Sequence, residues 1–144
     1  MTQKNYNTNL SAEFYVLSML HRKGFPAALT LGNAKAVDII IDLEGKLITL
    51  DVKGLAGKTC WPMDNFKKVL PNHFIVLVCF MDKISDEQTI PECWIIPSNR
   101  VERLLYRNPK GNRQVINRHK IRKLAPELLE NWNLLKGKTI KIKS

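Results

Sequence analysis

Two carboxylates, Asp38 and Asp51, become neighbours if the chain around them folds back on itself. The apolar segments 37–43 (VDIIIDL) and 46–53 (KLITLDVK) are separated only by Glu44-Gly45. Two residues ending in glycine between alternating segments predict a β-hairpin with a tight turn. In that hairpin the side chains of Asp38 and Asp51 face each other across the two strands.

The apolar residues of the two segments support this register. With the turn at Glu44-Gly45, one face of the hairpin is entirely apolar, and it carries Val37, Ile39, Ile41, Ile48, Leu50 and Val52. A shift of one residue would turn the apolar set of one strand to the other face. The predicted pairing of the two carboxylates therefore depends on the same register that builds the core.

Two carboxylates opposed across a strand pair repel each other and destabilise the sheet. A divalent cation removes that repulsion, and Mg²⁺ favours one or two carboxylates together with water and substrate oxygens. Asp38 and Asp51 supply this number, and the backbone carbonyl of Val52 could complete the protein's share. We therefore expect a Mg²⁺ site, in which Mn²⁺ can substitute, and no small-molecule cofactor.

Lys53 lies two residues after Asp51 and so projects from the same face of the strand. A metal-activated water with a preorganised cation beside it is suited to hydrolysing a phosphodiester. The alternative is a surface cluster of ion pairs, which explains Lys53 beside either aspartate but not the two carboxylates together. Glu44-x-Lys46 has the same acidic-x-Lys spacing as Asp51-x-Lys53, but it lies in the turn without a second carboxylate opposite. Gly54, which follows Lys53, is expected to open the backbone to a substrate.

The rest of the chain predicts an α/β fold with a central mixed β-sheet flanked by helices, in a single domain over residues 1–144. Glu13 borders the core-facing side of the first predicted helix, with solvation as the alternative. The predicted helices are 9–23 (capped by Asn9 or Ser11, ended by Gly24), 98–107 (capped by Ser98) and 127–135 (opened by Pro126). Further strands are expected at 27–31, 73–80 and 93–96, a helical turn near 64–69 within the loop 54–72, and irregular chain at 108–123.

Glu13 on a helix, Asp38 on a strand, and Asp51-x-Lys53 followed by Gly54 on the next strand resemble the PD-(D/E)XK nuclease superfamily. That superfamily includes restriction endonucleases and archaeal Holliday junction resolvases, and the resemblance covers roughly residues 9–80. Val37 stands where a proline is usual before the first aspartate. The resemblance implies a restriction endonuclease-like core and Mg²⁺-dependent cleavage of DNA. It makes Asp38 and Asp51 metal ligands, Lys53 the catalytic lysine, and Glu13 an additional or outer-shell acid.

The positive charge of the chain lies almost entirely in its last third. The formal net charge is +10, yet residues 1–97 carry 10 basic and 10 acidic residues, whereas residues 98–144 carry 13 and 3. A basic block of this kind predicts a polyanionic partner, most simply DNA, with RNA as an open alternative. The candidate nucleic-acid contacts are Arg100, Arg103 and Arg107 on one predicted helix face, together with Asn33, Lys35, Trp61, Arg113, Arg118, Lys120, Arg122 and Lys123.

Cys60, Cys79 and Cys93 have no paired spacing and predict free thiols. The longest apolar run, 74–81, has eight residues, which is too few to cross a bilayer. We therefore expect no membrane association and a cytoplasmic location. A core this small leaves little room for a separate recognition domain, and we expect a homodimer with one active site for each strand. The alternative function is a catalytically inactive nucleic-acid-binding protein of the same fold.

Overall fold

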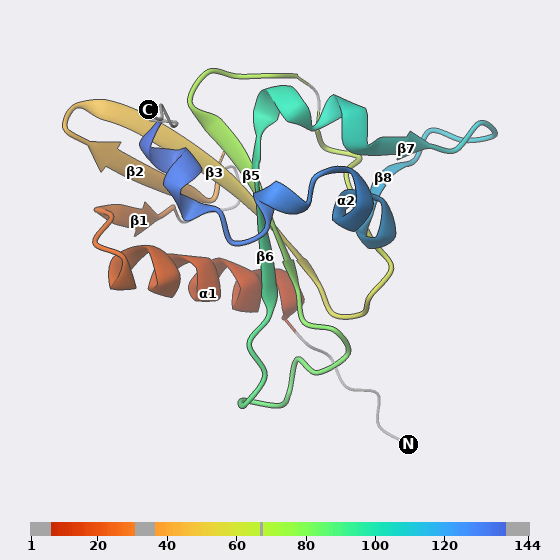
Figure 1. Ribbon diagram of the computed structural model, residues 1–144, viewed down its shortest axis with the longest axis horizontal. Coiled ribbons are helices and arrows are strands. Elements are labelled where there is room, and N and C mark those ends of the chain that lie inside the picture. The colour runs from red at the N-terminus through yellow and green to blue at the C-terminus, as the bar shows by residue number, and fades with distance from the viewer. Residues whose placement is uncertain (1–6, 31–36, 67, 138–144) are drawn as a thin grey trace.

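The computed structural model describes residues 7–30, 37–66 and 68–137. Its centre is a five-stranded sheet in the order β1-β2-β3-β5-β6 (Figure 1). The strands are β1 (Ala27–Leu29), β2 (Ile39–Leu43), β3 (Lys46–Leu55), β5 (His73–Cys79) and β6 (Glu92–Pro97). Only β3 and β5 run parallel, and all other neighbours are antiparallel. The predicted α/β class with a central mixed sheet is confirmed.

The predicted hairpin of β2 and β3 is confirmed with its register. Ile39 pairs with Leu50, and Leu43 pairs with Lys46 at the turn. Glu44 (φ 53°) and Gly45 (φ 87°) both adopt the left-handed conformation that a tight two-residue hairpin turn requires. The apolar face is buried as expected, because Ile39, Ile41, Ile48, Leu50 and Val52 are at most 4% exposed.

Helix α1 (Thr8–Arg22) packs on this apolar face through Ala12, Val16 and Leu20, all fully buried. Gly24 (φ +86°) ends the helix as predicted, with the Phe25 amide donating to the Leu20 carbonyl at 2.9 Å. The cap position is Asn7, so the prediction of Asn9 or Ser11 was wrong.

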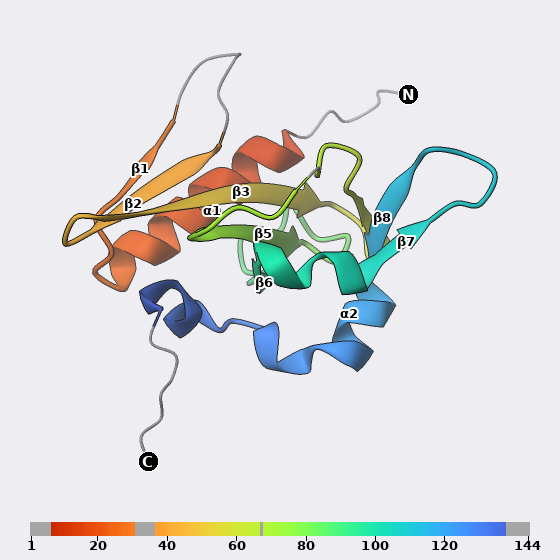
Figure 2. The same cartoon turned by 90° about the horizontal axis from the view of Figure 1, so that it is seen from above.

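A second sheet, which the sequence analysis missed, packs beyond the end of β3. It consists of β4 (Cys60–Pro62), β8 (Gln114–Asn117) and β7 (Leu105–Arg107), in that order, and α2 (Arg118–Leu124) follows β8. The predictions of a loop at 60–62 and of irregular chain over 108–123 are therefore wrong. Figure 2 shows the β7–β8 hairpin projecting from one end of the larger sheet.

The prediction of a helix over 98–107 is wrong. The segment forms two short 3₁₀ turns, Ser98–Arg100 and Glu102–Leu104, and then enters β7. Ser98 does not cap it, since the Ser98 hydroxyl donates to the Leu70 carbonyl (2.8 Å) and accepts from the Leu70 amide (3.1 Å). Pairing of Leu105 with Ile116 then draws the chain into extended conformation.

The prediction of a helix over 127–135 is also wrong, because this segment covers the open edge of β6. Leu129 bridges to Trp94, and the Glu130 amide donates to the Cys93 carbonyl at 2.8 Å. Glu130 has φ 54°, which separates the 3₁₀ turns Pro126–Leu128 and Trp132–Lys136. An edge strand is thereby protected from pairing with another chain.

The large sheet is buried on both faces. One core contains α1 and the apolar face of the hairpin, and the other contains Ile75 and Leu77 of β5 with Trp61 of the second sheet. The continuous apolar run predicted as a strand buried on both faces is therefore confirmed in β5. Cys60, Cys79 and Cys93 are free thiols as predicted. In the described part of the chain no helix is both long and apolar enough to cross a membrane.

Candidate active site and nucleic-acid interface

Asp38 lies where the regular pairing of β2 with β3 ends. Its amide donates to the Leu50 carbonyl at 2.9 Å, and its Oδ2 accepts the Val52 amide at 2.8 Å. The carboxylate therefore takes the place of a backbone acceptor at the end of the ladder. It fastens Asp38 to β3 at Val52, the residue after Asp51, whereas the regular register ends at the pair of Ile39 with Leu50.

Asp51 projects from the face of β3 opposite to Leu50 and Val52, and its side chain is 35% exposed. Its Oδ2 accepts a hydrogen bond from His73 Nε2 at 3.2 Å. His73 Nδ1 in turn lies 2.7 Å from the Thr49 hydroxyl, which donates to it when Nε2 carries the proton. The parallel pairing of β3 and β5 sets Thr49 opposite His73, so the strand register positions this histidine against the carboxylate.

Sequence reasoning missed His73. The available signal was a polar residue at the head of an otherwise apolar buried strand, and that signal alone names no partner. His73 is only 5% exposed, and both ring nitrogens are hydrogen-bonded. This buried histidine restricts the orientation of the Asp51 carboxylate and leaves Oδ1 for another ligand.

Lys53 is half-buried on the same face of β3 as Asp51. Its charge also acts on Asp64, a carboxylate just after β4 that the sequence did not single out. The pKa of Asp64 is lowered mainly by the Gln114 amide, which donates to it at 2.9 Å, and further by the Arg113 guanidinium and the charge of Lys53. A third carboxylate thus lies within electrostatic reach of the catalytic lysine candidate.

Gly54 has a different role from the one expected. A Cβ atom there would lie 2.7 Å from the Thr8 carbonyl oxygen and 3.1 Å from Ala12 Cβ. The Gly54 amide donates to Asn9 Oδ1 at 2.8 Å. Glycine is required because α1 packs directly against the backbone of β3, and the prediction that it opens the strand to a substrate was wrong.

Glu13 is buried, with 8% of its surface exposed, so the alternative of a solvated helix acid was wrong. It lies on the side of α1 that packs against β3, with Val16 and Leu20. α1 covers the face of β3 that Leu50 and Val52 form, whereas Asp51 projects from the other face. The structure therefore has Asp51 and Lys53 on one face of β3, Asp38 bonded to that strand at Val52, and Glu13 on the helix that covers the other face.

Two carboxylates with a backbone carbonyl form a donor set of the kind that Mg²⁺ accepts. In the described ranges no group of three His, Cys, Asp or Glu side chains is placed to hold a metal ion. Zinc sites commonly use three or four such ligands, whereas Mg²⁺ needs one or two carboxylates and keeps several waters. Asp38 and Asp51, with the Val52 carbonyl as a third oxygen, would hold such an ion.

Most arginines predicted to contact phosphate are engaged in ion pairs. The shared helix face of Arg100, Arg103 and Arg107 does not exist, since Arg107 lies in β7. The pairs are Arg100–Glu127 (2.6 Å), Arg107–Glu102 (2.8 Å), Arg113–Asp64 (2.8 Å) and Arg118–Glu92 (2.8 Å). The first three are exposed and contribute little to stability, so a phosphate can replace the carboxylate.

Arg118 is different because its pair with Glu92 is bidentate and mostly buried. Nε and Nη2 donate to the two Glu92 oxygens at 2.9 and 2.8 Å, and the side chains are 14% and 21% exposed. The Arg118 hydrogen bonds lower the pKa of Glu92. Arg118 therefore ties α2 to β6, and its predicted role as a phosphate contact is not supported.

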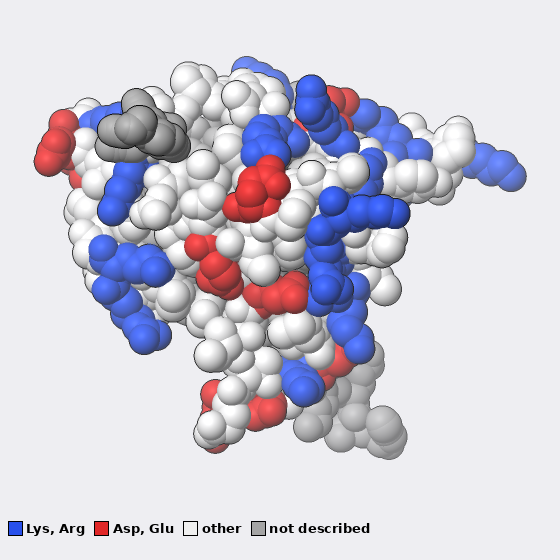
Figure 3. All heavy atoms as spheres, viewed as in Figure 1, with Lys and Arg blue, Asp and Glu red and all other residues white. Residues whose placement is uncertain are grey.

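Trp61 cannot stack on a base in this structure. It is fully buried in the second core, and its Nε1 donates to the Val78 carbonyl at 3.1 Å. Asn33 and Lys35 lie outside the described residues. The remaining predicted contacts, Arg103, Lys120, Arg122 and Lys123, lie in or near α2, where Figure 3 shows lysine and arginine side chains gathered along one side of the molecule.

No family model matches the sequence, and no curated protein does. Among solved structures, "The structure of a bacterial homing endonuclease: I-Ssp6803I" matches with a TM-score of 0.53 and 17% sequence identity. The match covers 90% of this chain and 90% of the other. At this identity the likeness concerns the fold, so the chain has the fold of a known nuclease.

Proposed function

We propose that this protein is a metal-dependent endonuclease that hydrolyses DNA phosphodiester bonds, as a member of the PD-(D/E)XK superfamily. The observation that carries the proposal is the fastening of Asp38 beside Asp51 on β3, with Lys53 on the face of Asp51. Likeness to a homing endonuclease over 90% of both chains adds support at the level of the fold. A fold alone does not establish an activity.

The roles follow from the positions of the side chains. Asp38 and Asp51 would hold Mg²⁺, which supplies an activated water and neutralises charge that develops on the phosphate. His73 holds one oxygen of Asp51, so the carboxylate is preoriented. Lys53 stabilises the negative charge of the transition state and orients the attacking water.

The decisive variant is Asp51→Asn, assayed on supercoiled plasmid with Mg²⁺ and by DNA binding in EDTA. We expect cleavage to be lost, while binding is kept or tightened because a negative charge near phosphate is removed. The matched control is Asp42→Asn, an exposed aspartate beside the β2–β3 turn, which should cleave like the wild type. Full cleavage by Asp51→Asn would refute the proposal. Binding without cleavage by the wild type in either Mg²⁺ or Mn²⁺ would favour an inactive nucleic-acid-binding protein.

We further propose that the enzyme acts in the cytoplasm as a homodimer that presents one active site to each strand. Two cuts on opposite strands need two sites, and each chain carries one set of Asp38, Asp51 and Lys53. Light scattering with and without duplex DNA tests this directly. A monomeric mass in both conditions would contradict the dimer and leave the chemistry of the site unaffected.

A further inference from the structure

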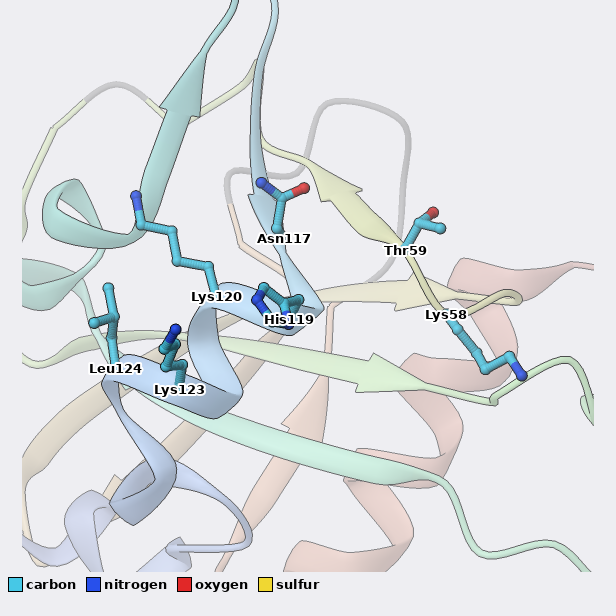
Figure 4. A pocket seen from close by; sticks show the side chains of 7 residues that line it. All are labelled: Lys58, Thr59, Asn117, His119, Lys120, Lys123 and Leu124. Atoms are coloured by element: carbon cyan, nitrogen blue, oxygen red, sulfur yellow. The ribbon is translucent and has the colours of Figure 1, made fainter.

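A hollow of about 660 Å³ opens on the molecular surface between α2 and the chain that leads into β4. Figure 4 shows its walls, with α2 on one side and the segment of Lys58 and Thr59 on the other. We call it the α2 pocket, and it is lined by Lys58, Thr59, Asn117, His119, Lys120, Lys123 and Leu124. Three lysines and a histidine from two separate parts of the chain line it.

The charge of the α2 pocket is poorly compensated, in contrast to that of the nearby arginines. No acidic side chain lines the pocket among the described residues. Lys58 lies 3.8 Å from Asp82, but both side chains are more than half exposed, so this pair is weak. Lys120 reaches only a backbone oxygen, that of Leu105, at 3.4 Å. The lysines of this pocket are therefore available to a polyanion.

A second, smaller hollow of about 180 Å³ adjoins the first, and Leu124 lines both. Its walls include Arg100 and Arg103. Leu124 is 58% exposed, so it forms an apolar ridge between two cationic depressions. Two adjacent cationic depressions suit a chain of phosphates better than a single small anion, and an apolar ridge suits the sugar between them.

We propose that the α2 pocket binds an internal backbone phosphate of the DNA strand, and that the adjacent phosphate crosses Leu124 toward Arg100 and Arg103. The identity of the ligand as DNA depends on the proposed function, whereas the binding of a phosphate chain depends only on the pocket. Lysines suit this use because they neutralise phosphate as point charges without base recognition.

The second sheet sets the distance from this pocket to the active-site lysine. Thr59 precedes β4 and Asp64 follows it five positions later, a span of at most about 18 Å when extended. Asp64 is within electrostatic reach of Lys53. The mapped position of the bound phosphate relative to the cut would therefore measure the distance between the pocket and the active-site lysine.

The first test uses binding alone, in EDTA, with a duplex of arbitrary sequence. The pocket variant is Lys58→Gln with Lys123→Gln, and the control is Lys23→Gln with Lys46→Gln, exposed lysines at the other end of α1 and β3. Both variants lose two positive charges. For the pocket variant we expect the log–log slope of affinity against salt to fall by about 0.9 for each phosphate lost, and by less for the control.

A second readout locates the contact. The chain has three histidines, and only His119 lines the pocket. In proton NMR the His119 resonance should shift on addition of the duplex or of inorganic pyrophosphate, while that of His21, which lies outside the pocket and the proposed active site, serves as the internal reference. Equal salt slopes in the pocket and control variants, or an unmoved His119 resonance in protein saturated with DNA, would overturn the proposal. A shift produced by anionic lipid vesicles but not by DNA would also overturn it.

The distance is tested on a duplex whose cleavage position has been mapped. Single methylphosphonate substitutions remove the charge of one phosphate at a time. Substitution of the one phosphate that occupies the pocket should weaken wild-type binding and leave the pocket variant unaffected. If the protein proves not to cleave DNA, the salt slope and the His119 shift still decide whether the pocket binds phosphate, so the two proposals can fail separately.

Discussion

Asp38 is expected to serve both the fold and the metal site, and two substitutions separate these roles. Asp38→Ala removes the oxygen that accepts the Val52 amide at 2.8 Å. Val52 is only 4% exposed, so its amide has little access to water. An unsatisfied buried donor costs about 1–3 kcal/mol. For a chain of this size that corresponds to a fall in melting temperature of about 4 °C for each kcal/mol.

Asp38→Asn keeps a carbonyl oxygen in the same place and loses only the charge. The hydrogen bond weakens because the acceptor is neutral, but the repulsion from Asp51 also disappears. We therefore expect a change of less than about 1 kcal/mol in the free energy of unfolding. Both variants lose one of two carboxylates, so both should bind Mg²⁺ or Mn²⁺ at least about tenfold more weakly.

The assays are thermal unfolding by circular dichroism and metal titration by calorimetry, each on the wild type and both variants. Asp42→Ala and Asp42→Asn are the matched controls, since Asp42 is exposed and accepts only the Gly45 amide in the turn (3.1 Å). Equal destabilisation by Asp38→Asn and Asp38→Ala would refute the structural role of the hydrogen bond. Unchanged metal affinity in Asp38→Asn would refute its role as a ligand.

Three further predictions concern the surroundings of the site. Gly54→Ala should destabilise the protein by about 1–3 kcal/mol in urea unfolding, because the new Cβ would lie 2.7 Å from a backbone oxygen of α1. His73→Ala should weaken metal binding about 10–100-fold in calorimetry by freeing Asp51, and His73→Gln should restore part of it. Hydrogen bonds from Arg118 lower the pKa of Glu92. The ion pair therefore stabilises the fold above the unfolded-state pKa of about 4.3, and this contribution is lost as the pH falls through the folded-state pKa of Glu92. Glu92→Gln should therefore show a shallower loss of stability below about pH 4.5 in urea unfolding.

Each of these has an outcome that would contradict it. Gly57→Ala is the control for Gly54, since its nearest neighbour would be Asp82 Oδ1 at 3.5 Å, and similar unfolding of both variants would argue against close helix packing. A folded His73→Ala protein with wild-type metal affinity would show that the histidine does not position Asp51. Parallel stability curves for Glu92→Gln and the wild type would mean that the ion pair contributes nothing through its titration.

The hairpin could be predicted because two independent signals specify one register. The glycine-containing turn fixes which residues pair, and the alternation of apolar residues fixes which face is buried. Asp38, Asp51 and Lys53 follow from that register without further assumption. Their roles as ligands and catalytic lysine stay predictions, since the comparisons concern the fold.

The second sheet and the partners of the site could not be predicted, because they depend on contacts between distant segments. Cys60 pairs with Asn117, and Asp64 accepts the Gln114 amide, each across about 50 residues of sequence. Short strands such as β4 carry too little alternation to be recognised locally. His73 was missed for the same reason, since only the parallel register of β5 with β3 brings it to Asp51.

The charge of the last third has two physical roles that a count of basic residues cannot separate. Arg118 is held by both oxygens of Glu92 and fixes the start of α2 against β6. The lysines that follow on α2 have no such partner among the described residues, and they are presented on a segment that this pair holds in place. Substitution of Lys123 should therefore change DNA affinity without changing stability, whereas substitution of Arg118 should lower stability first and affinity only through it. The separation follows from chemistry, because a planar guanidinium suits a bidentate buried pair and a hydrated ammonium suits an exposed phosphate contact.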